Sequence, residues 1–470
     1  MKKTNENLIV AKFGGTSMAN SDTIAKVADI IKSDKVRRFV IVSAPGKRIS
    51  SDTKVTDMLY AYAEDIFGIA KWDKAALAAR LGSIRERFDS IVSGLKINLN
   101  IDIEIDIIVD WLISHSGADR GVIRDYLASR GEYMAGKIMA ARLGYEFVDA
   151  CDIIKFDAKG GFLADRTNEL CTKRLSRVKG GAVIPGFYGS CESDNTLIRT
   201  FSRGGSDVSG AIVARAAGAT VYENWTDVDG FMKTDPRIVD NPSLIDILTY
   251  KELRELAYMG ANVLHHESIF PVRSSDIPIN IRNTFNPKYK GTMIVPTKHF
   301  GQGEYVRNGT IITGIAGKKD FVAISVEKSM MGSELGFARR FLEVLERQGI
   351  SLEHMPTGID TMCVVFEKSQ LKGQSTEAVV SSIKKELNPD KIKIIEDMAL
   401  IAIVGHGMES TTGVSAAALT SLACSGINIR LLDQGSSELN IIVGVSNSDF
   451  ESAIKALYTM SEVPVCPVSK

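Results

Sequence analysis

A short apolar run that leads into two glycines stands near the N-terminus and reads Leu8-Ile9-Val10-Ala11-Lys12-Phe13-Gly14-Gly15-Thr16-Ser17. The apolar run predicts a buried β-strand, and apolar residues at helical spacing across 22–32 predict that a helix follows. Glycines at a strand end permit positive φ and let backbone N–H groups approach phosphate oxygens closely. Lys12 would add a positive charge for a transferring phosphate. An ordinary strand–turn–helix junction with a surface lysine explains this segment equally well.

Apolar runs and helical patterns continue to alternate as far as about residue 300. Further strands are predicted at 39–43, 182–185, 219–222 and 279–282, and helices at 54–70, 74–92, 206–217 and 251–259. Strands separated by helices imply βα crossovers, and therefore a mostly parallel sheet that is covered on both faces. Ligands of such open sheets bind beyond the carboxyl ends of the strands, which is where the motifs fall.

A second glycine pair opens the helix predicted at 206–217, in the segment Ser202-Arg203-Gly204-Gly205-Ser206-Asp207. An arginine and two glycines at a helix start are typical of a nest for a small anion. Arg203 could bind a carboxylate there through two parallel hydrogen bonds. Ser206 or Asp207 could instead serve only as the cap of the helix. We favour the binding site over the cap.

A third polar segment, Thr226-Asp227-Val228-Asp229-Gly230, follows the strand at 219–222 and continues through Lys233-Thr234-Asp235-Pro236-Arg237. Its acidic residues do not have the spacing of an EF-hand loop. We predict a nucleotide clamp in which Lys233 and Arg237 face phosphates, with a polar turn before a proline as the alternative.

Three other patterns do not indicate sites. The segment 131–137 resembles a Walker P-loop, but Ile138 replaces the required Ser or Thr and the segment lies inside a helical pattern at 123–143. No G-x-G-x-x-G follows a predicted strand, so a dinucleotide-binding dehydrogenase is not supported. His265 and His266 lack partners for a metal, and we predict no metal-ligating residues.

Composition excludes several classes of protein. The 470 residues are 44% hydrophobic and 24% charged, which indicates a globular chain of more than one domain. Lys plus Arg equals Asp plus Glu at 57 each, so no net charge favours nucleic acid or a membrane. The six cysteines show no CxxC spacing, and we expect them to be reduced thiols. Neither a signal peptide nor a membrane helix is recognised, and we expect a cytoplasmic protein.

The C-terminal part contains an internal repeat. Gly336 and Gly349 recur 77 residues later as Gly413 and Gly426, with matching apolar residues around them. Each copy reads as strand, loop, amphipathic helix, glycine stop, strand, turn and strand. The repeat indicates duplication of one supersecondary unit, with the stretch at 291–317 as the connector.

Taken together, the motifs resemble the aspartokinase branch of the amino-acid kinase family. The resemblance implies a three-layer α/β/α sandwich with a mostly parallel sheet at 1–300, followed by two ferredoxin-like ACT modules at 301–395 and 396–470. In Gly-Ala-Lys-Val-Leu-His-Pro the family often has a lysine and a proline where this chain has Asn262 and His266, so Asn262 is left out of the site. The segments that carry the resemblance are 12–17, 42–44, 130–132, 202–207, 226–230, 235–237 and 260–265.

The resemblance also implies roles for the matching residues. Lys12 would neutralise charge on the transferring γ-phosphoryl group, and Asp207 would orient the lysine, the phosphates or Mg²⁺. Arg203 would bind the α-carboxylate of aspartate, and Glu132 its ammonium group. The implied substrate-binding residues are Ser43, Thr53, Glu132, Arg203 and Ser206. The implied ATP-binding residues are Lys12, Gly14, Gly15, Ser17, Thr226, Asp227, Lys233 and Arg237.

The repeated unit resembles tandem ACT modules, which bind amino acids between paired copies. A carboxylate at Glu353 would face a side-chain ammonium, which favours lysine as the effector, with threonine as the alternative. The resemblance implies a homodimer or a higher homo-oligomer. A plain dimerisation module with a solvated Glu353 is the alternative. The implied effector-binding residues are Met331, Ser333, Glu334, Ser351, Leu352 and Glu353.

The implied activity is ATP-dependent phosphorylation of the β-carboxylate of L-aspartate, with Mg²⁺, as the first step of lysine, threonine and methionine biosynthesis. An end-product amino acid would inhibit it through the ACT modules. Two alternatives stay open at this point. One is a related kinase that acts on a glutamate-type acceptor, and the other is an amino-acid sensor without catalytic activity.

Overall fold

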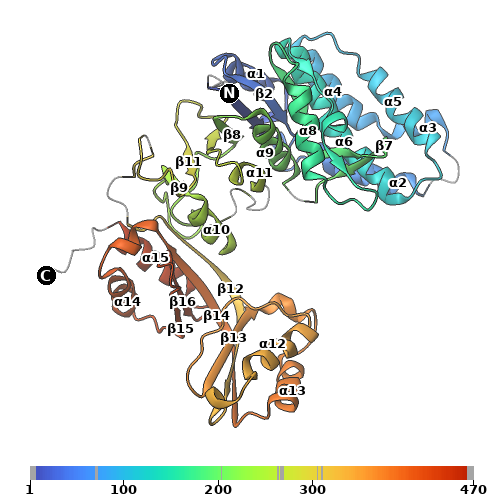
Figure 1. Cartoon of the computed structure of the whole chain (residues 1–470). Coiled ribbons are helices and arrows are strands. Elements are labelled where there is room, and N and C mark those ends of the chain that lie inside the picture. The colour runs from blue at the N-terminus through green and yellow to red at the C-terminus, as the bar shows by residue number, and fades with distance from the viewer. Residues whose placement is uncertain are drawn as a thin grey trace. The chain divides into compact units, whose positions relative to one another are not determined.

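The computed structural model describes residues 7–68, 72–202, 204–261, 264, 269–303, 305–307 and 311–462. Its contacts divide the chain into two compact units (Figure 1). The first unit comprises residues 1–231, 246–250 and 263–307, and the second comprises 232–245, 251–262 and 308–470. Two short stretches that precede residue 300 therefore make their contacts with the C-terminal part of the chain.

The first unit is built on an eight-stranded sheet with the order β3-β5-β2-β1-β8-β10-β11-β9. Neighbouring strands pair in parallel except for β10 and β11, which are antiparallel. The central strands are almost wholly buried, as their unbroken apolar runs predict for a sheet covered on both faces. The strands are β1 (Ile9–Phe13), β2 (Arg37–Val42), β3 (Glu146–Phe147), β5 (Ala182–Pro185), β8 (Val221–Thr226), β9 (Ile247–Thr249), β10 (Ile279–Asn283) and β11 (Thr292–Val295).

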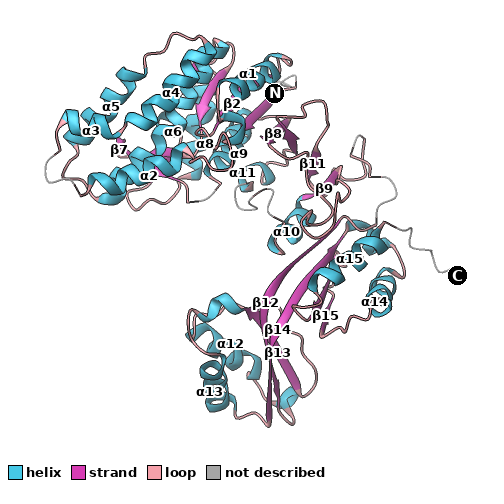
Figure 2. Cartoon of the chain, turned by 180° about the vertical axis from the view of Figure 1, so that it is seen from behind, coloured by secondary structure: helices cyan, strands magenta, loops and turns pink. Residues whose placement is uncertain are grey.

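Helices enclose this sheet, and Figure 2 shows them in cyan around the magenta strands. A small second sheet with the order β4-β6-β7 lies in the same unit. Its strands are β4 (Lys155–Phe156), β6 (Tyr188–Cys191) and β7 (Asp194–Thr200). The helices of the unit are α1 (Ser21–Lys32), α2 (Val55–Ile66), α3 (Lys74–Arg80), α4 (Gly82–Leu95), α5 (Ile101–Ser114), α6 (Arg120–Leu143), α7 (Ala150–Ile153), α8 (Ala164–Leu175), α9 (Gly205–Ala217) and α11 (Phe270–Arg273).

One predicted helix is split in two, and one long helix was not predicted. The single helix predicted at 74–92 is split into α3 and α4, because the backbone leaves helical geometry at Leu81 (φ −80°, ψ 1°). The sequence did not indicate α5, since residues 101–107 alternate isoleucine and acidic residues with the period of a strand. Burial nevertheless follows helical spacing at Ile101, Ile105 and Ile108, and the Asn100 side chain caps the helix start.

The second unit is built on a five-stranded antiparallel sheet with the order β13-β12-β14-β16-β15. Its two long strands, β12 (Gly314–Glu327) and β14 (Lys391–Val404), pair along their length. The other strands are β13 (Thr361–Glu367), β15 (Leu431–Asp433) and β16 (Asn440–Val445). The helices are α12 (Phe337–Arg347), α13 (Thr376–Leu387), α14 (Val414–Cys424) and α15 (Phe450–Ser461), and α10 (Tyr250–Tyr258) makes most of its contacts in this unit.

The two long strands serve two modules, each with its own apolar core. Residues 321–327 and 391–397 belong to the first module, whose core includes Phe337 and Phe341 of α12. Residues 314–320 and 398–404 belong to the second, whose core includes Leu422 and Leu457. The second module thus takes one strand from the chain that precedes the first module. The predicted architecture, a mostly parallel α/β domain followed by two α+β modules, is confirmed.

The stretch at 291–317 is not the simple connector that we expected. It contains β11 and the first residues of β12, because Thr292–Val295 forms a strand that pairs with β10 on one side and with β9 on the other. Within the described ranges, no helix combines the length and the apolar character that a membrane span requires.

Candidate active site

The first glycine pair lies at the carboxyl end of β1, where two loops approach each other closely. Gly14 donates its N–H to the carbonyl of Trp225 at 3.0 Å, and Gly46 donates to the carbonyl of Gly15 at 2.8 Å. A Cβ on Gly46 would lie 2.6 Å from the carbonyl carbon of Gly15. Gly15 has φ −59°, so the positive φ that we expected is not what explains this glycine. A Cβ on Gly15 would lie 3.2 Å from the carbonyl oxygen of Ala44, whereas a Cβ on Gly14 would meet nothing closer than 3.6 Å, so close approach explains Gly15 and Gly46 but not Gly14.

A 3₁₀ turn (η1, Thr16–Met18) follows this glycine pair, and α1 begins only at Ser21. Two hydroxyl groups of this turn are already bonded. Thr16 Oγ1 donates to Asp227 Oδ2 at 3.1 Å, and Ser17 Oγ lies 2.8 Å from Thr284 Oγ1. The turn therefore joins the loop after β1 to the loops after β8 and β10.

The second glycine pair starts α9 with a backbone that other residues adopt at a cost. Gly204 has φ 55°, in the left-handed region, and a Cβ on Gly205 would lie 2.5 Å from Phe187 Cδ2. No side chain caps the helix start, so Ser206 and Asp207 do not serve as helix caps. Arg203, the predicted carboxylate ligand, lies outside the described residues.

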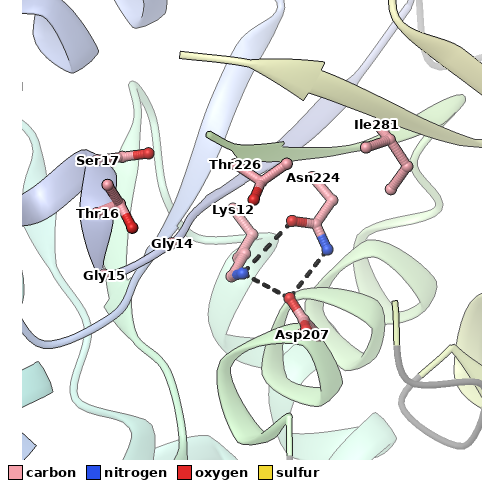
Figure 3. A pocket seen from close by; sticks show the side chains of 9 residues that line it. All are labelled: Lys12, Gly14, Gly15, Thr16, Ser17, Asp207, Asn224, Thr226 and Ile281. Carbon is pink, nitrogen blue, oxygen red and sulfur yellow. Dashed lines mark hydrogen bonds and ion pairs between the residues drawn. The ribbon is translucent and has the colours of Figure 1, made fainter. Parts of the chain in front are cut away.

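Lys12 meets an acidic and an amide side chain above the sheet (Figure 3). Its Nζ lies 2.6 Å from Asp207 Oδ1 and 3.4 Å from Asn224 Oδ1. Asn224 Nδ2 in turn donates to Asp207 Oδ1 at 2.9 Å. Lys12 is 8% exposed and Asn224 is 4% exposed. The sequence pointed to Lys12 and Asp207, but nothing in it singled out Asn224.

Two pockets meet at this cluster. Pocket A has a volume of about 230 Å³ and lies over the first glycine pair. Pocket B has a volume of about 340 Å³ and lies over the second. Lys12 and Asp207 line both pockets. Pocket A is further lined by Gly14, Gly15, Thr16, Ser17, Asn224, Thr226 and Ile281, and pocket B by Ser43, Thr56, Tyr60, Phe187, Ser202, Gly204, Gly205 and Ser206.

Thr53, a predicted substrate contact, lines a different cavity with Arg48, Asp52 and Arg87. Pocket B is instead lined by Thr56 and Tyr60, which sequence reasoning missed. Both residues lie on α2, four positions apart and therefore on one helix face. That spacing is the signal that could have identified them.

The structure places Lys233 and Arg237, the predicted phosphate contacts, in the second unit. Lys233 is 9% exposed, and its Nζ forms an ion pair with Glu462 at 2.7 Å. Arg237 forms an ion pair with Asp235 at 2.6 Å, and its side chain is 87% exposed. The charge of Lys233 is thus already engaged by α15 and the residue that follows it.

Glu132 is a buried carboxyl in the middle of α6. The backbone N–H of Ala44, next to Ser43, donates to it, whereas its Oε2 has no hydrogen-bond partner among the described residues. Burial without a cation raises the pKa of Glu132 to about 8. The neighbouring Arg130 offers no ion pair, because its guanidinium is held over the rings of Tyr126 and Tyr133.

The predicted effector residues lie in two segments of the first module. Glu334 is already paired with Lys328 at 2.7 Å and with Arg340, and these hydrogen bonds lower its pKa. Glu353 hydrogen-bonds Tyr258 through its side chain. In the part of the chain that the structure covers, no hydrogen bond or ion pair joins the segment 331–334 to the segment 351–353.

Oxygen ligands for Mg²⁺ are present at the edge of pocket A. Asp207 lines the pocket, and Asp227 accepts a hydrogen bond from Thr16, which lines it too. Lys12 and Asn224 both bond Asp207 Oδ1, and no side chain of the described residues bonds Oδ2. Mg²⁺ commonly binds one or two carboxylates together with substrate phosphates and water. Among the residues with described placement, no group of three His, Cys, Asp or Glu forms a ready-made metal cage. The residues present therefore fit a metal that arrives with a nucleotide.

Comparison with known proteins agrees with this geometry. The model of the amino acid kinase family matches residues 7–283, and a model of the ACT domain matches residues 401–460. Aspartokinase 3 of Bacillus subtilis is 35% identical, over 96% of this chain and 97% of that protein. The chain belongs to the aspartokinase branch of the amino acid kinase family.

The structure of this aspartokinase is similar to solved structures of aspartate kinases. The crystal structure of Clostridium acetobutylicum aspartate kinase has a TM-score of 0.84 and 44% identity, and covers 97% of this chain and 100% of that one. Escherichia coli aspartokinase III in complex with aspartate and ADP has a TM-score of 0.70 and 25% identity, with coverage of 96% and 99%. The same enzyme with lysine and aspartate has a TM-score of 0.68 and 25% identity, with coverage of 97% and 99%. The aspartokinase is therefore an aspartate kinase, and a sensor without catalytic activity is excluded.

Proposed function

We propose that this aspartokinase transfers the γ-phosphoryl group of ATP to the β-carboxylate of L-aspartate, with ATP in pocket A and aspartate in pocket B. The observation that carries the proposal is that Lys12 and Asp207 line both pockets. One ammonium group can therefore contact a phosphoryl group on either side of the transfer. The complex of E. coli aspartokinase III with aspartate and ADP supports this pair of ligands.

Positioning and charge stabilisation carry the proposed chemistry. A carboxylate is already a competent nucleophile at pH 7, so no general base is required. Lys12 offsets the negative charge of the phosphoryl group, and the backbone around Gly14 and Gly15 lines its path. Mg²⁺, when bound with ATP, would be held by Asp207 with Asp227 nearby, and supplies further charge neutralisation.

Recognition of aspartate rests on groups around pocket B. Ser43 and Ser206 line that pocket and can bond the substrate carboxylates. Glu132 would pair with the ammonium group, and its unpartnered Oε2 supports this role. The role of Arg203 as the ligand of the α-carboxylate rests on the motif alone. Thr56 replaces Thr53 in our proposal because it lines pocket B.

The experiment that tests the proposal is turnover of ATP with one acceptor at a time. We expect kcat/KM for L-aspartate to exceed that for L-glutamate by about 10- to 200-fold, because pocket B would have to accommodate an extra methylene. N-acetylglutamate and carbamate should give no turnover above background. Comparable kcat/KM with any of these acceptors would refute aspartate as the substrate.

We further propose that lysine inhibits the enzyme through the first ACT module, with threonine as the alternative effector. Supporting observations are the carboxylate of Glu353 and the lysine complex of E. coli aspartokinase III. Since the segments 331–334 and 351–353 are not joined within the chain, we propose that a second copy completes the pocket. Met330, Leu335 and Ile359, which are 74%, 99% and 85% exposed, give this module an apolar surface for such a copy.

Replacing Glu353 with alanine should weaken lysine inhibition. The change removes the carboxylate that would pair with the side-chain ammonium of lysine, an interaction worth about 1.5–3 kcal/mol. The lysine concentration for half inhibition should therefore rise roughly tenfold or more, relative to the turnover of the same variant without lysine. The matched control is Glu346→Ala, which removes an exposed carboxylate from α12 of the same module. Equal inhibition of both variants would contradict the assigned pocket.

A further inference from the structure

Asn224 is a buried amide at the place where pockets A and B meet. The register of the sheet pairs Asn224 of β8 with Lys12 of β1 on one side and with Ile281 of β10 on the other. Side chains of register partners on adjacent strands project from the same face of a sheet. Asn224 therefore stands beside Lys12 because of strand pairing and not because of a flexible loop.

The amide contacts both members of the Lys12–Asp207 ion pair (Figure 3). Its Oδ1 accepts from Lys12 Nζ at 3.4 Å, and its Nδ2 donates to Asp207 Oδ1 at 2.9 Å. Lys12 Nζ and Asp207 Oδ1 are themselves 2.6 Å apart. The three groups thus form a closed ring. A carboxamide can close this ring because it offers an acceptor to the ammonium and a donor to the carboxylate.

This ring determines which atoms remain available to ligands. Lys12 and Asn224 both bond Oδ1 of Asp207, and no side chain in the described part of the chain bonds Oδ2. An ammonium has three N–H donors, so Lys12 keeps one donor for a phosphoryl oxygen. Without the amide, Asp207 could rotate and draw Lys12 away from the junction of the pockets.

We propose that Asn224 is a positioning residue for phosphoryl transfer. It holds Asp207 in one orientation, with Oδ2 open to a ligand, and holds the Lys12 ammonium at the junction of pockets A and B. Asn224 acts through these two groups. The inference rests on the proposed function, because it assigns the transfer to that junction.

Two substitutions and a pH series test the role. Asn224→Leu removes both hydrogen bonds, and we expect kcat to fall about tenfold or more at every pH, since misplaced catalytic groups are costly. Asn224→Asp introduces a second carboxylate beside Asp207 at high pH. Once protonated, however, this acid offers an O–H donor and a C=O acceptor, as the amide does.

The kcat of Asn224→Asp, divided by that of the wild type at the same pH, should therefore rise as the pH falls from 9 to 6. The rise should approach about tenfold per unit where the new acid is mostly ionised. Division by the kcat of the wild type at the same pH removes the effect of titrating groups that the two proteins share. The same ratio for Asn224→Leu should stay constant, and the thermal stability of both variants is measured alongside.

A packing role would lower the stability of both variants but leave the ratio for Asn224→Asp independent of pH. A flat ratio overturns the proposal, as does a kcat of Asn224→Leu within threefold of the wild type. Failure of the wild type to phosphorylate aspartate would instead refute the proposed function. In that case the affinity for ADP provides the test. The affinity of Asn224→Asp for ADP, divided by that of the wild type at the same pH, should rise as the pH falls. A constant ratio there also overturns the proposal.

Discussion

Replacing Lys12 with methionine should lower kcat at least about 100-fold, since loss of one group that stabilises transferring charge costs about 3–4 kcal/mol. Methionine keeps most of the volume of the lysine stem but removes the ammonium that lies 2.6 Å from Asp207. Without that cation, the Asp207 carboxylate would also repel the phosphoryl group. Steady-state turnover with saturating ATP and L-aspartate measures the effect.

A matched control separates this role from the general loss of a buried lysine. Lys155 is 4% exposed and hydrogen-bonds Ser190 and Asn195, and its Nζ has no carboxylate partner within the described ranges. Lys155→Met should lower stability by leaving these acceptors unpaired, with kcat within a few-fold of the wild type.

A double variant shows whether the loss of stability in Lys12→Met arises from the unpaired Asp207 carboxylate. Lys12→Met combined with Asp207→Asn removes both charges and should regain stability, but its kcat should remain at least about 100-fold low. Near-normal turnover of Lys12→Met would refute the assignment of Lys12 to the phosphoryl group.

The KM for L-aspartate should rise as the pH falls below about 8, the value to which burial raises the pKa of Glu132. Below that pH the free enzyme carries a neutral carboxyl, which cannot pair with the substrate ammonium. Binding then requires loss of a proton, so KM should increase about tenfold per unit as the pH decreases. Initial rates at saturating ATP between pH 6 and pH 9 measure the slope.

The same pKa shift has a consequence for stability. The pKa of an ordinary glutamate is 4.5, and that of Glu132 in the folded chain is raised to about 8. The raised pKa therefore contributes its full share to the free energy of unfolding below pH 4.5, and this contribution is lost as the pH rises through 8.

Glu132→Gln removes the titration and keeps the shape of the side chain. We expect it to raise KM roughly 30- to 150-fold at pH 8 or above, the effect of about 2–3 kcal/mol for a charge-assisted hydrogen bond. The slope of KM with pH should disappear. Glu104→Gln serves as the control, because Glu104 is equally buried and has an unpartnered Oε2, but pairs with Lys137 at 2.6 Å. A wild-type KM that does not change between pH 6 and pH 8 would contradict the role of Glu132.

Local features of the chain predicted much of the fold. The apolar run at 182–185 and the alternating isoleucines at 279–282 located two strands to within one residue. The two glycine pairs were recognised because the first directly follows a predicted strand and the second directly precedes a predicted helix. Helix α5 was not predicted, because its first residues alternate apolar and acidic side chains and an alternating sequence can bury one helix face as well as one strand face.

The surroundings of several predicted site residues, and the one residue that the sequence missed at the centre of the site, could not be read from local patterns. A basic residue after an acidic loop looks like a phosphate ligand, but Lys233 is paired with Glu462, 229 positions away. Thr53 and Thr56 are equally plausible in sequence, and only the start of α2 at Val55 decides which one lines pocket B. Asn224 carries no motif, and its contact with Lys12 spans 212 positions.

Local patterns in the chain were enough to predict the parallel sheet, the duplicated C-terminal unit and the cation beside each glycine pair, because periodicity and glycine chemistry act over a few neighbouring residues. That Lys12 and Asp207 line both pockets, and that Asn224 closes the ring between them, follows only from the folded chain. The register of β1 against β8 is set by the burial of whole strands, and it joins side chains that no local pattern relates.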